Sequence, residues 1–525
     1  MGLRKISCIL ALCVMALSAY AVPARRDGQL RKAADGREIM VYMHGNEDFH
    51  YLTDASGVWL DEKTLAPLDE AVKSEKLKVK SERQARRAVQ ATGVNRLLAP
   101  KGPVILVNFT DTAFSNSLEA VTEWVKGENY SVGGTQGSIR QYFYDNSFGQ
   151  YDIDFDVYGP VTLSHNCSYY GANWGNVDGR DMHPGEMVKE ACQLVNQQYD
   201  VDFSQYDYNE DEEVDWVVIV YAGHGEADSY YANTVWPHQS TVSGLTLDGK
   251  RIGRYCCTNE IAWNGGLAGI GVFVHEFSHI MGLPDLYTTD YSTHKTLAEW
   301  DIMDYGCYNG DLKYPPMYSS YERWWMGWLE PKQLHTNAAN ITLGDLDYSQ
   351  EAYFVTANGD SIENILSPYP NVFYMIENRQ QSSWDTYLPG HGMLVTKVNY
   401  RYTWWSGNSV NNSANNMGVD ILEADGLTPS RDDSDPYNGY YGKPGDAYPN
   451  GATSFTQLND YQITDIAETN GVITFKVNGG RETPSAIEHT NHSVQNTNKI
   501  LRNGQLFIIR NGKEYDILGH ENNQL

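Results

Sequence analysis

Residues 271–287 read GVFVHEFSHIMGLPDLY, and this stretch decides how the rest of the chain is interpreted. Residues four apart on a helix lie on one face, so His275 and His279 can present two imidazoles to one metal ion. Glu276, between them, can reach a water molecule bound to that ion. Zinc lowers the pKa of such a water to about 7, and a neighbouring carboxylate can act as its general base. The stretch therefore predicts a zinc site for peptide hydrolysis.

The residues after His279 predict how the helix ends and what completes the metal site. Gly282 suits a left-handed turn, and Pro284 prevents the helix from continuing. Asp285 follows on the returning chain, ten residues after His275. This longer pattern, His-Glu-x-x-His-x-x-Gly-x-x-Asp, resembles that of the metzincins with Asp in place of their usual third histidine. Asp285 is therefore the predicted third zinc ligand.

A rival third ligand is Glu299, twenty residues after His279, which is the kind of spacing that thermolysin-like enzymes use. Metzincins also need a methionine turn under the metal, and residues 300–306 (WDIMDYG) supply one with Met303 as the candidate. Neither this turn nor the glycine turn has a role in the rival scheme. We therefore prefer Asp285 to Glu299.

Two tyrosines follow the methionine turn. Tyr305 and Tyr308 are candidates for support of the transition state, because metzincins often place a tyrosine hydroxyl near the metal or the oxyanion there. The chain has 37 tyrosines, so packing is the competing interpretation of both residues.

Length and charge indicate an exported protein of several units. The chain has 525 residues, which predicts two to four units, and a formal net charge of −28. Such acidity argues against a nucleic-acid partner and suits a protein that binds calcium.

Residues 1–21 have the pattern of a secretory signal peptide. Two basic residues precede an apolar run at 9–17, and Ala19-Tyr20-Ala21 is a small-x-small cleavage site. The run is too short to span a membrane, and no later stretch reaches about eighteen apolar residues. We therefore expect a secreted or cell-surface protein without a transmembrane segment.

Residues 22–99 are predicted to form a pro-segment, with paired strands within 38–52 and a charged helix or linker over 73–89. This segment has no cysteine, so a thiolate cannot block the zinc; His44, His50 or an acidic side chain are the candidates. Beyond the signal peptide the chain has an odd number of cysteines, which allows one or two disulfides without fixing the pairing. They are Cys167, Cys192, Cys256, Cys257 and Cys307.

Residues 100–339 are predicted to form the catalytic unit. Apolar runs at 102–111 and 216–223 predict buried strands, and 138–146 and 186–198 predict helices that pack on them. This order of elements fits an α/β (α+β) metzincin-like unit.

An acidic loop precedes the second of these strands. Asp207, Asn209, Asp211 and Asp215 stand at positions one, three, five and nine of a calcium-loop spacing. Position six is Glu212, where such loops have Gly for a sharp turn, and position twelve lacks the usual Glu. A partial calcium site and a solvated acidic loop both stay open.

The remainder of the chain predicts β-structure. Residues 340–479 read as short alternating strands, a β-rich continuation of the peptidase unit, and the polar residues 480–499 read as a linker. In residues 500–525, Asn511-Gly512 between two apolar runs predicts a hairpin in a small β-module. That module resembles the tails of secreted Bacteroidetes proteins, which implies recognition by a secretion machinery; a plain stabilising hairpin is the alternative.

Together these features resemble one family: residues 98–478 resemble the immune inhibitor A family of secreted zinc metallopeptidases. The matching segments are 104–111, 207–215, 221–226, 236–238, 275–287, 300–306, 321–328, 377–379, 388–392 and 423–426. The resemblance implies His275, His279 and Asp285 as zinc ligands, Glu276 as base, a latent exported precursor, and calcium near Asp207. The departure from the family's usual Gly at position 212 puts only the calcium site in doubt.

The sequence thus predicts a secreted endopeptidase with one catalytic zinc, acting on extracellular proteins or peptides. Glu276 would take a proton from the zinc-bound water and pass it to the leaving amine. The alternative is a catalytically silent binding or adhesive protein on the same scaffold, which would have no need of Glu276.

Overall fold

The computed structural model describes residues 20–87, 98–174, 179–290, 292, 294–426, 441–458, 460–481, 497–502, 505–510 and 513–515. The chain forms two compact units, residues 1–479 and 480–525, and each is described by itself. Among the described residues, no helix is both long enough and apolar enough to cross a membrane.

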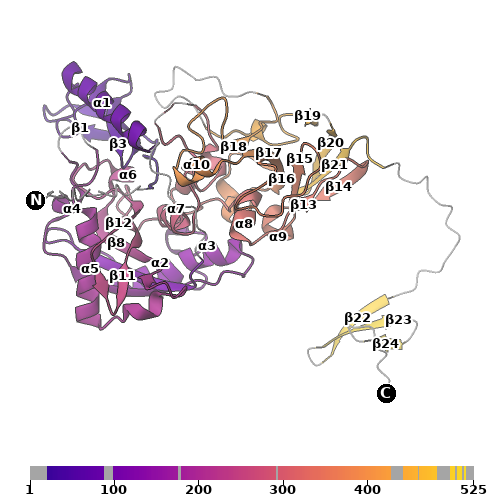
Figure 1. Ribbon diagram of the computed structural model, residues 1–525, viewed down its shortest axis with the longest axis horizontal. Coiled ribbons are helices and arrows are strands. Elements are labelled where there is room, and N and C mark those ends of the chain that lie inside the picture. Colours follow the sequence, from indigo (N-terminus) through magenta and orange to yellow (C-terminus); the bar gives the residue numbers. More distant parts are fainter. Residues whose placement is uncertain are drawn as a thin grey trace, which may run out of the picture. The chain divides into compact units, whose positions relative to one another are not determined.

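The first unit begins with a four-stranded antiparallel sheet, called here the N-terminal sheet (indigo in Figure 1). Its strands, in spatial order, are β1 Gln29–Lys32, β2 Glu38–Asn46, β3 Phe49–Asp54 and β4 Trp59–Leu60. Helix α1, Glu70–Arg87, follows them. The strands predicted within 38–52 are thereby confirmed. Of the two interpretations of 73–89, helix or linker, the structure forms the helix as far as Arg87, and residues 88 and 89 lie outside the described residues.

A five-stranded central sheet follows, with strand order β6-β5-β8-β12-β9. Its strands are β5 Lys101–Asn108, β6 Asp154–Thr162, β8 Val217–His224, β9 His238–Thr241 and β12 Arg254–Ile261. All pair in parallel except β9, which runs antiparallel to β12 at the edge. β5 and β8 are the buried strands that the sequence predicts. β9 is thus the edge strand of this sheet.

Alternate residues of β5 face two separate apolar cores, because side chains alternate along a strand. Val104 and Leu106 belong to one core with Phe277, and Ile105 and Val107 belong to the other. The helices of the first core are α2 Leu118–Lys126, α3 Ile139–Asn146 and α7 Gly271–Ile280, and that of the second is α5 Pro184–Tyr199. A mixed α/β layering thus holds α7 against the sheet.

A β-rich part completes the first unit (orange in Figure 1). One sheet has the order β13-β15-β16-β17-β18 and the other β14-β21-β20-β19. Their bounds are β13 Lys332–Gln333, β14 Ala339–Leu343, β15 Tyr353–Thr356, β16 Val372–Arg379, β17 Gly392–Asn399, β18 Val419–Ile421, β19 Phe455–Leu458, β20 Tyr461–Thr469 and β21 Val472–Val477. Residues of both sheets share one apolar core, which includes Ile376, Val395 and Ile473.

Shorter elements connect these parts. They are α4 Cys167–Gly171, β7 Glu213–Val214, α6 Glu226–Ser229, β10 Thr246–Leu247, β11 Lys250–Ile252, α8 Ser320–Met326, α9 Leu346–Ser349 and α10 Tyr402–Ser406. All five cysteines among the described residues are buried free thiols, so the structure forms neither of the disulfides that the sequence allows.

The second unit contains a three-stranded antiparallel sheet. Its strands are β22 Thr497–Arg502, β23 Gln505–Arg510 and β24 Lys513–Tyr515. β22 begins inside the stretch that the sequence predicts as a linker. The predicted turn residues 511–512 lie outside the described residues, although the strands on either side of them pair as a hairpin requires.

Candidate active site

Helix α7 and the turn after it bring two histidines and an aspartate together. The Nε2 atoms of His275 and His279 are 3.2 Å apart, and Asp285 Oδ1 lies 3.1 and 3.2 Å from them. Gly282 has a φ of +97°, the left-handed conformation that the sequence predicts at this turn. The turn therefore returns the chain so that Asp285 faces the helix.

Backbone carbonyls orient both imidazoles. Nδ1 of His275 is 2.7 Å from the carbonyl oxygen of Ile302, and Nδ1 of His279 is 2.8 Å from that of Leu283. A ring whose Nδ1–H donates to a carbonyl keeps the Nε2 lone pair free for a metal. The Ile302 contact joins α7 to the methionine turn, and Met303 in that turn is fully buried.

Asp285 is held by a residue that sequence reasoning missed. Its carboxylate accepts a hydrogen bond from the side-chain amide of Asn408, and its backbone N–H donates to Asn408 Oδ1 at 2.8 Å. Asn408 follows 123 residues later, in the β-rich part of the unit. No local motif marks it, so only the folded chain reveals the contact.

The cluster suits zinc. Two imidazole nitrogens and a carboxylate oxygen are typical zinc ligands, and Zn–N and Zn–O bonds of about 2.0–2.1 Å give a tetrahedron with edges of about 3.3 Å. The three donor atoms are 3.1–3.2 Å apart and belong to buried side chains. Glu299 lies outside the cluster, where its carboxylate accepts a hydrogen bond from Gly442 N–H at 2.7 Å. The fold thus assembles the Asp285 arrangement rather than its rival.

Glu276 is fully buried beside the cluster, and burial raises its pKa well above the usual range. Its Oε1 accepts a hydrogen bond from the backbone N–H of Val22 at 2.7 Å, and Oε2 has no hydrogen-bond partner. The candidate base therefore faces a backbone amide of the chain's own N-terminal segment.

That segment, residues 20–26, crosses the site, and its Tyr20 forms an antiparallel bridge with Gln239 of β9. Tyr20 and Gln239 exchange two backbone hydrogen bonds of 2.9 and 2.7 Å. The Tyr20 ring also lies 4.9 Å from the ring of His279. Ala21 and Val22 are 1% and 0% exposed, so the cleft closes around them. The sheet edge beside α7 therefore binds a peptide main chain.

Side chains from three other places hold the same segment. The Tyr287 hydroxyl donates to the carbonyl of Ala21, and Trp236 Nε1–H donates to the carbonyl of Val22 at 3.1 Å. The Tyr308 hydroxyl donates to the next carbonyl at 2.6 Å. The sequence alone predicts no role for Tyr287. Its position shortly after Asp285 is the one feature of the sequence that places it near the site.

The two predicted tyrosines both meet this N-terminal segment. Tyr308 binds the carbonyl of Pro23, and Tyr305 stacks its ring against the guanidinium of Arg26, 3.3 Å from the ring centroid. The histidines considered as blocking groups lie elsewhere: His44 bonds Thr53 within the N-terminal sheet, and His50 belongs to another cluster.

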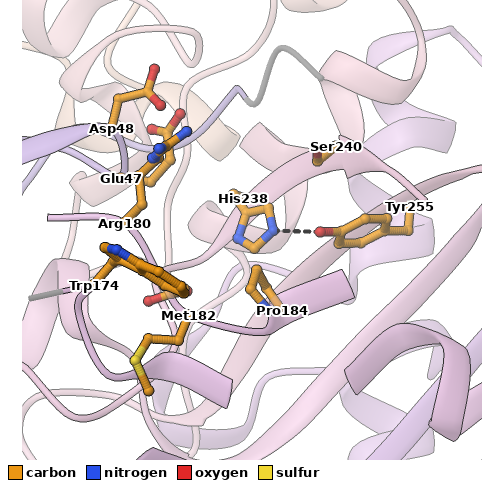
Figure 2. A pocket seen from close by; sticks show the side chains of 10 residues that line it. Glu47, Asp48, Trp174, Arg180, Met182, Pro184, His238, Ser240 and Tyr255 are labelled. Atoms are coloured by element: carbon orange, nitrogen blue, oxygen red, sulfur yellow. Dashed lines mark hydrogen bonds between the residues drawn. The ribbon is translucent and has the colours of Figure 1, made fainter. Parts of the chain in front are cut away.

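A cavity of about 320 Å³ adjoins β9 (Figure 2). Glu47 and Asp48 of the N-terminal sheet line one side, and His238 and Tyr255 of the central sheet line the other. His238 Nε2 is 2.7 Å from the Tyr255 hydroxyl, and burial lowers the pKa of His238 to about 4. His238 is therefore a neutral, structural part of the wall.

The acidic loop is internally hydrogen-bonded. Asp207 binds the Lys250 ammonium at 2.7 Å, and Asp211 and Asp215 accept backbone hydrogen bonds from within the loop. Glu212 has a φ of +67°, the left-handed conformation for which calcium loops use Gly at this position. Within the described part of the chain, three loop carboxylates do not converge on one point. Calcium at this loop stays a prediction.

Comparison with known proteins supports the site. Residues 119–329 match the family model described as "Immune inhibitor A peptidase M6, catalytic domain". These residues are therefore similar to the catalytic domain of the M6 peptidase family. They include α7, the turn to Asp285 and the methionine turn.

Two relatives are similar to part of the chain, and the first is a metalloprotease by name. The chain is 27% identical over 252 residues to "Pre-pro-metalloprotease PrtV" of Vibrio cholerae serotype O1, covering 40% of this chain and 26% of the relative. It is also 27% identical over 207 residues to "Immune inhibitor A" of Bacillus thuringiensis subsp. alesti, covering 33% and 29%. The matches thus span less than a third of each relative's length.

Proposed function

We propose that this chain is the precursor of a secreted zinc endopeptidase that hydrolyses peptide bonds in extracellular proteins. One observation carries the proposal. The chain's own Tyr20 pairs with Gln239 of β9 and lies against His279 of the metal-ligand cluster, and two residues later the Val22 N–H donates to Glu276. A cleft built in this way can hold a substrate peptide at the metal.

In this proposal each residue has a role. His275, His279 and Asp285 would hold a zinc ion, which when bound would polarise the substrate carbonyl and acidify a water molecule. Glu276 would accept the water's proton and then deliver it to the leaving amine, because its Oε1 already lies 2.7 Å from a peptide nitrogen. The Tyr287 hydroxyl would hold the carbonyl on the other side of the bond.

Latency and export are parts of the same proposal. Residues 1–21 would be removed as a signal peptide, and residues 22–99 would act as a pro-segment. Burial of Val22 and Ala24 supports this role, because a substrate cannot enter while they fill the cleft. The C-terminal unit would be read by a secretion machinery, and the loop at Asp207 would take calcium as a secondary site.

The test compares the processed protein with its Glu276→Ala variant on unfolded casein. We expect at least a hundredfold loss of activity in the variant, which removes the general base. Zinc bound to the variant should be unchanged, because the three proposed ligands remain. A chelator should abolish the activity of the unmodified protein.

Glu299→Gln is the matched control, since it changes the carboxylate of the rival ligand scheme. It should keep both zinc and activity. Equal casein hydrolysis by the Glu276→Ala and unmodified proteins would refute the assigned base. No hydrolysis by either, with zinc bound and the pro-segment removed, would favour a binding protein.

A further inference from the structure

A second group of metal-ligand side chains lies between the N-terminal sheet and the peptidase domain. His50 is on β3, Glu62 follows β4, and Glu226 is on α6. Their ligand atoms lie within 4.8 Å of one another. Asn173, after α4, places its side-chain amide among them. Two of the four residues thus come from each side of the contact.

Four distances within the group are close to those between the ligands of a tetrahedral site. His50 Nε2 and Glu226 Oε1 are 3.1 Å apart. The Asn173 amide atom is 3.0 Å from Glu226, 3.1 Å from His50 and 3.4 Å from Glu62. These lengths bracket the edge of about 3.3 Å of a zinc tetrahedron. They also match the edges of the catalytic cluster.

The side-chain amide of Asn173 can take either of two orientations that exchange its oxygen and nitrogen. Only the hydrogen-bond network distinguishes the two orientations. With Nδ2 turned toward the cluster, its two hydrogens face three partner atoms, and Oδ1 is buried without a hydrogen-bond partner. Rotating the amide by half a turn would present Oδ1 to the cluster as a fourth metal-ligand atom. A cation bound between the four side chains would give each of their ligand atoms a partner.

Burial and charge favour a cation there. His50 and Glu226 are both 0% exposed, and Glu226 Oε2 has no hydrogen-bond partner. Glu62 is paired with the Lys76 ammonium at 2.7 Å, which leaves the Glu226 charge to be balanced. A buried carboxylate needs such a balance. Either a proton on His50 or a metal ion can supply it.

We propose that His50, Glu62, Asn173 and Glu226 bind a second divalent transition-metal ion, with zinc as the ion to test. The ion fastens the N-terminal sheet to the peptidase domain, because each side contributes two ligands. Imidazole and carboxylate donors suit zinc and its neighbours better than calcium, which prefers oxygen ligands alone. The site is separate from the catalytic cluster and shares no residue with it.

Metal counting tests this proposal. The full precursor is prepared in a Glu276→Ala background to prevent self-processing and dialysed against limiting zinc. Zinc per chain is then measured by elemental analysis. We expect two ions in this protein, one after adding His50→Ala, one after adding His279→Ala, and none after adding both. The two single changes separate this site from the catalytic one.

His44→Ala is the matched control, because His44 is a half-buried histidine of the same sheet and bonds Thr53 instead. It should leave two ions. Should His50→Ala fail to fold, Glu62→Gln tests the same site at a more accessible position. One ion in the precursor, lost with His279→Ala and unaffected by His50→Ala, would overturn the proposal and assign the balancing charge to a proton on His50.

A second inference comes from the contact between Val22 and Glu276 and rests on the proposed function. The predicted signal cleavage falls between Ala21 and Val22. Hydrolysis of that bond would turn the Val22 amide nitrogen, 2.7 Å from Glu276 Oε1, into a free α-amino group. We infer that this new terminus restrains the enzyme by pairing directly with its general base.

Contacts further along the segment keep Val22 in place after such a cut. Trp236 and Tyr308 bind the carbonyls of Val22 and Pro23, and Ala24 N–H donates to the carbonyl of Gly45 at 2.8 Å. Beyond them, the guanidinium of Arg25 binds Asp311 at 3.0 Å. None of these bonds involves the leader, so all survive its removal.

The test compares precursors that begin at Val22, at Ala21, and at Val22 with an acetylated α-amino group. A free Val22 amine keeps its N–H donor at Glu276 Oε1 and carries no added residue or acetyl group, so the free Val22 terminus should give the lowest peptidase activity, by roughly tenfold. Fully processed enzyme is the positive control. If it is inactive, the proposed function fails; if it is active and the three precursors are equally latent, the inference about Val22 fails.

Discussion

At the scale of single residues, the site depends on side chains that hold the proposed zinc ligands in place. Asn408 binds both the carboxylate and the backbone of Asp285. Backbone carbonyls fix the two imidazoles. Such supporting contacts set ligand orientation and therefore metal affinity.

Asn408→Ala should weaken zinc binding by about 10- to 100-fold, because Asp285 loses the two hydrogen bonds that Asn408 makes with it. Competition with a zinc chelator measures the change. Asn412→Ala is the control, since Asn412 lies in the same loop and bonds Thr289 instead. Equal zinc affinity in the two variants would contradict a positioning role for Asn408.

At the scale of secondary-structure elements, helix α7 and the turn after it set the positions of the three proposed zinc ligands. α7 is buried along its whole length and packs its aromatic residues against the central sheet, with Phe277 4.8 Å from Trp216 and 5.7 Å from Phe155, centroid to centroid. The turn at Gly282 then returns Asp285 to the helix face. Loss of either would displace a ligand.

Phe277→Ala should lower the free energy of unfolding by about 3–5 kcal/mol, because it leaves a cavity in a fully buried aromatic cluster. Denaturant unfolding of the full chain measures this. Tyr348→Ala, at a position that is 72% exposed, should change stability by less than about 0.5 kcal/mol. A Phe277 effect as small as the control's would refute the assigned packing.

Gly282→Ala should cost about 1–2 kcal/mol in stability and reduce zinc affinity, because a side chain disfavours the left-handed conformation. Gly266→Ala is the matched control: its φ is not in that region and an added Cβ meets only one atom, at 3.5 Å. Zinc affinity and unfolding are measured for both variants. Unchanged zinc affinity in Gly282→Ala would show that the turn does not set the position of Asp285.

The elements that the sequence predicted best are those with strong periodicity. The helix over the zinc motif, the strands β5 and β8, and the helices α3 and α5 appear where the patterns place them. Short motifs also predicted the His275, His279 and Asp285 cluster, because all three residues lie within one helix and its turn. Contacts between distant segments, such as Asn408 with Asp285 or Val22 with Glu276, leave no local pattern.

At the scale of the whole molecule, two compact units divide the chain at residues 479 and 480. The first unit contains the M6-family segment, the N-terminal sheet and the β-rich part. The cleft is therefore closed by a part of the same unit, and opening it requires that residues 22–26 leave.

Truncation after residue 479 should leave the stability and the zinc content of the first unit unchanged, because residues 480–525 form a separate unit. The melting temperature and the zinc content are measured for the full-length and the truncated protein. A drop in melting temperature of more than about 2 °C would indicate that the second unit stabilises the first.

The central claim is that His275, His279 and Asp285 hold a zinc ion beside Glu276. Anomalous X-ray scattering at the zinc absorption edge, from crystals of the precursor, tests it most directly. The account predicts a peak in contact with the Nε2 atoms of both histidines and with Asp285 Oδ1. A peak that includes Glu299 instead of Asp285, or no peak at the histidines in zinc-loaded crystals, would contradict it.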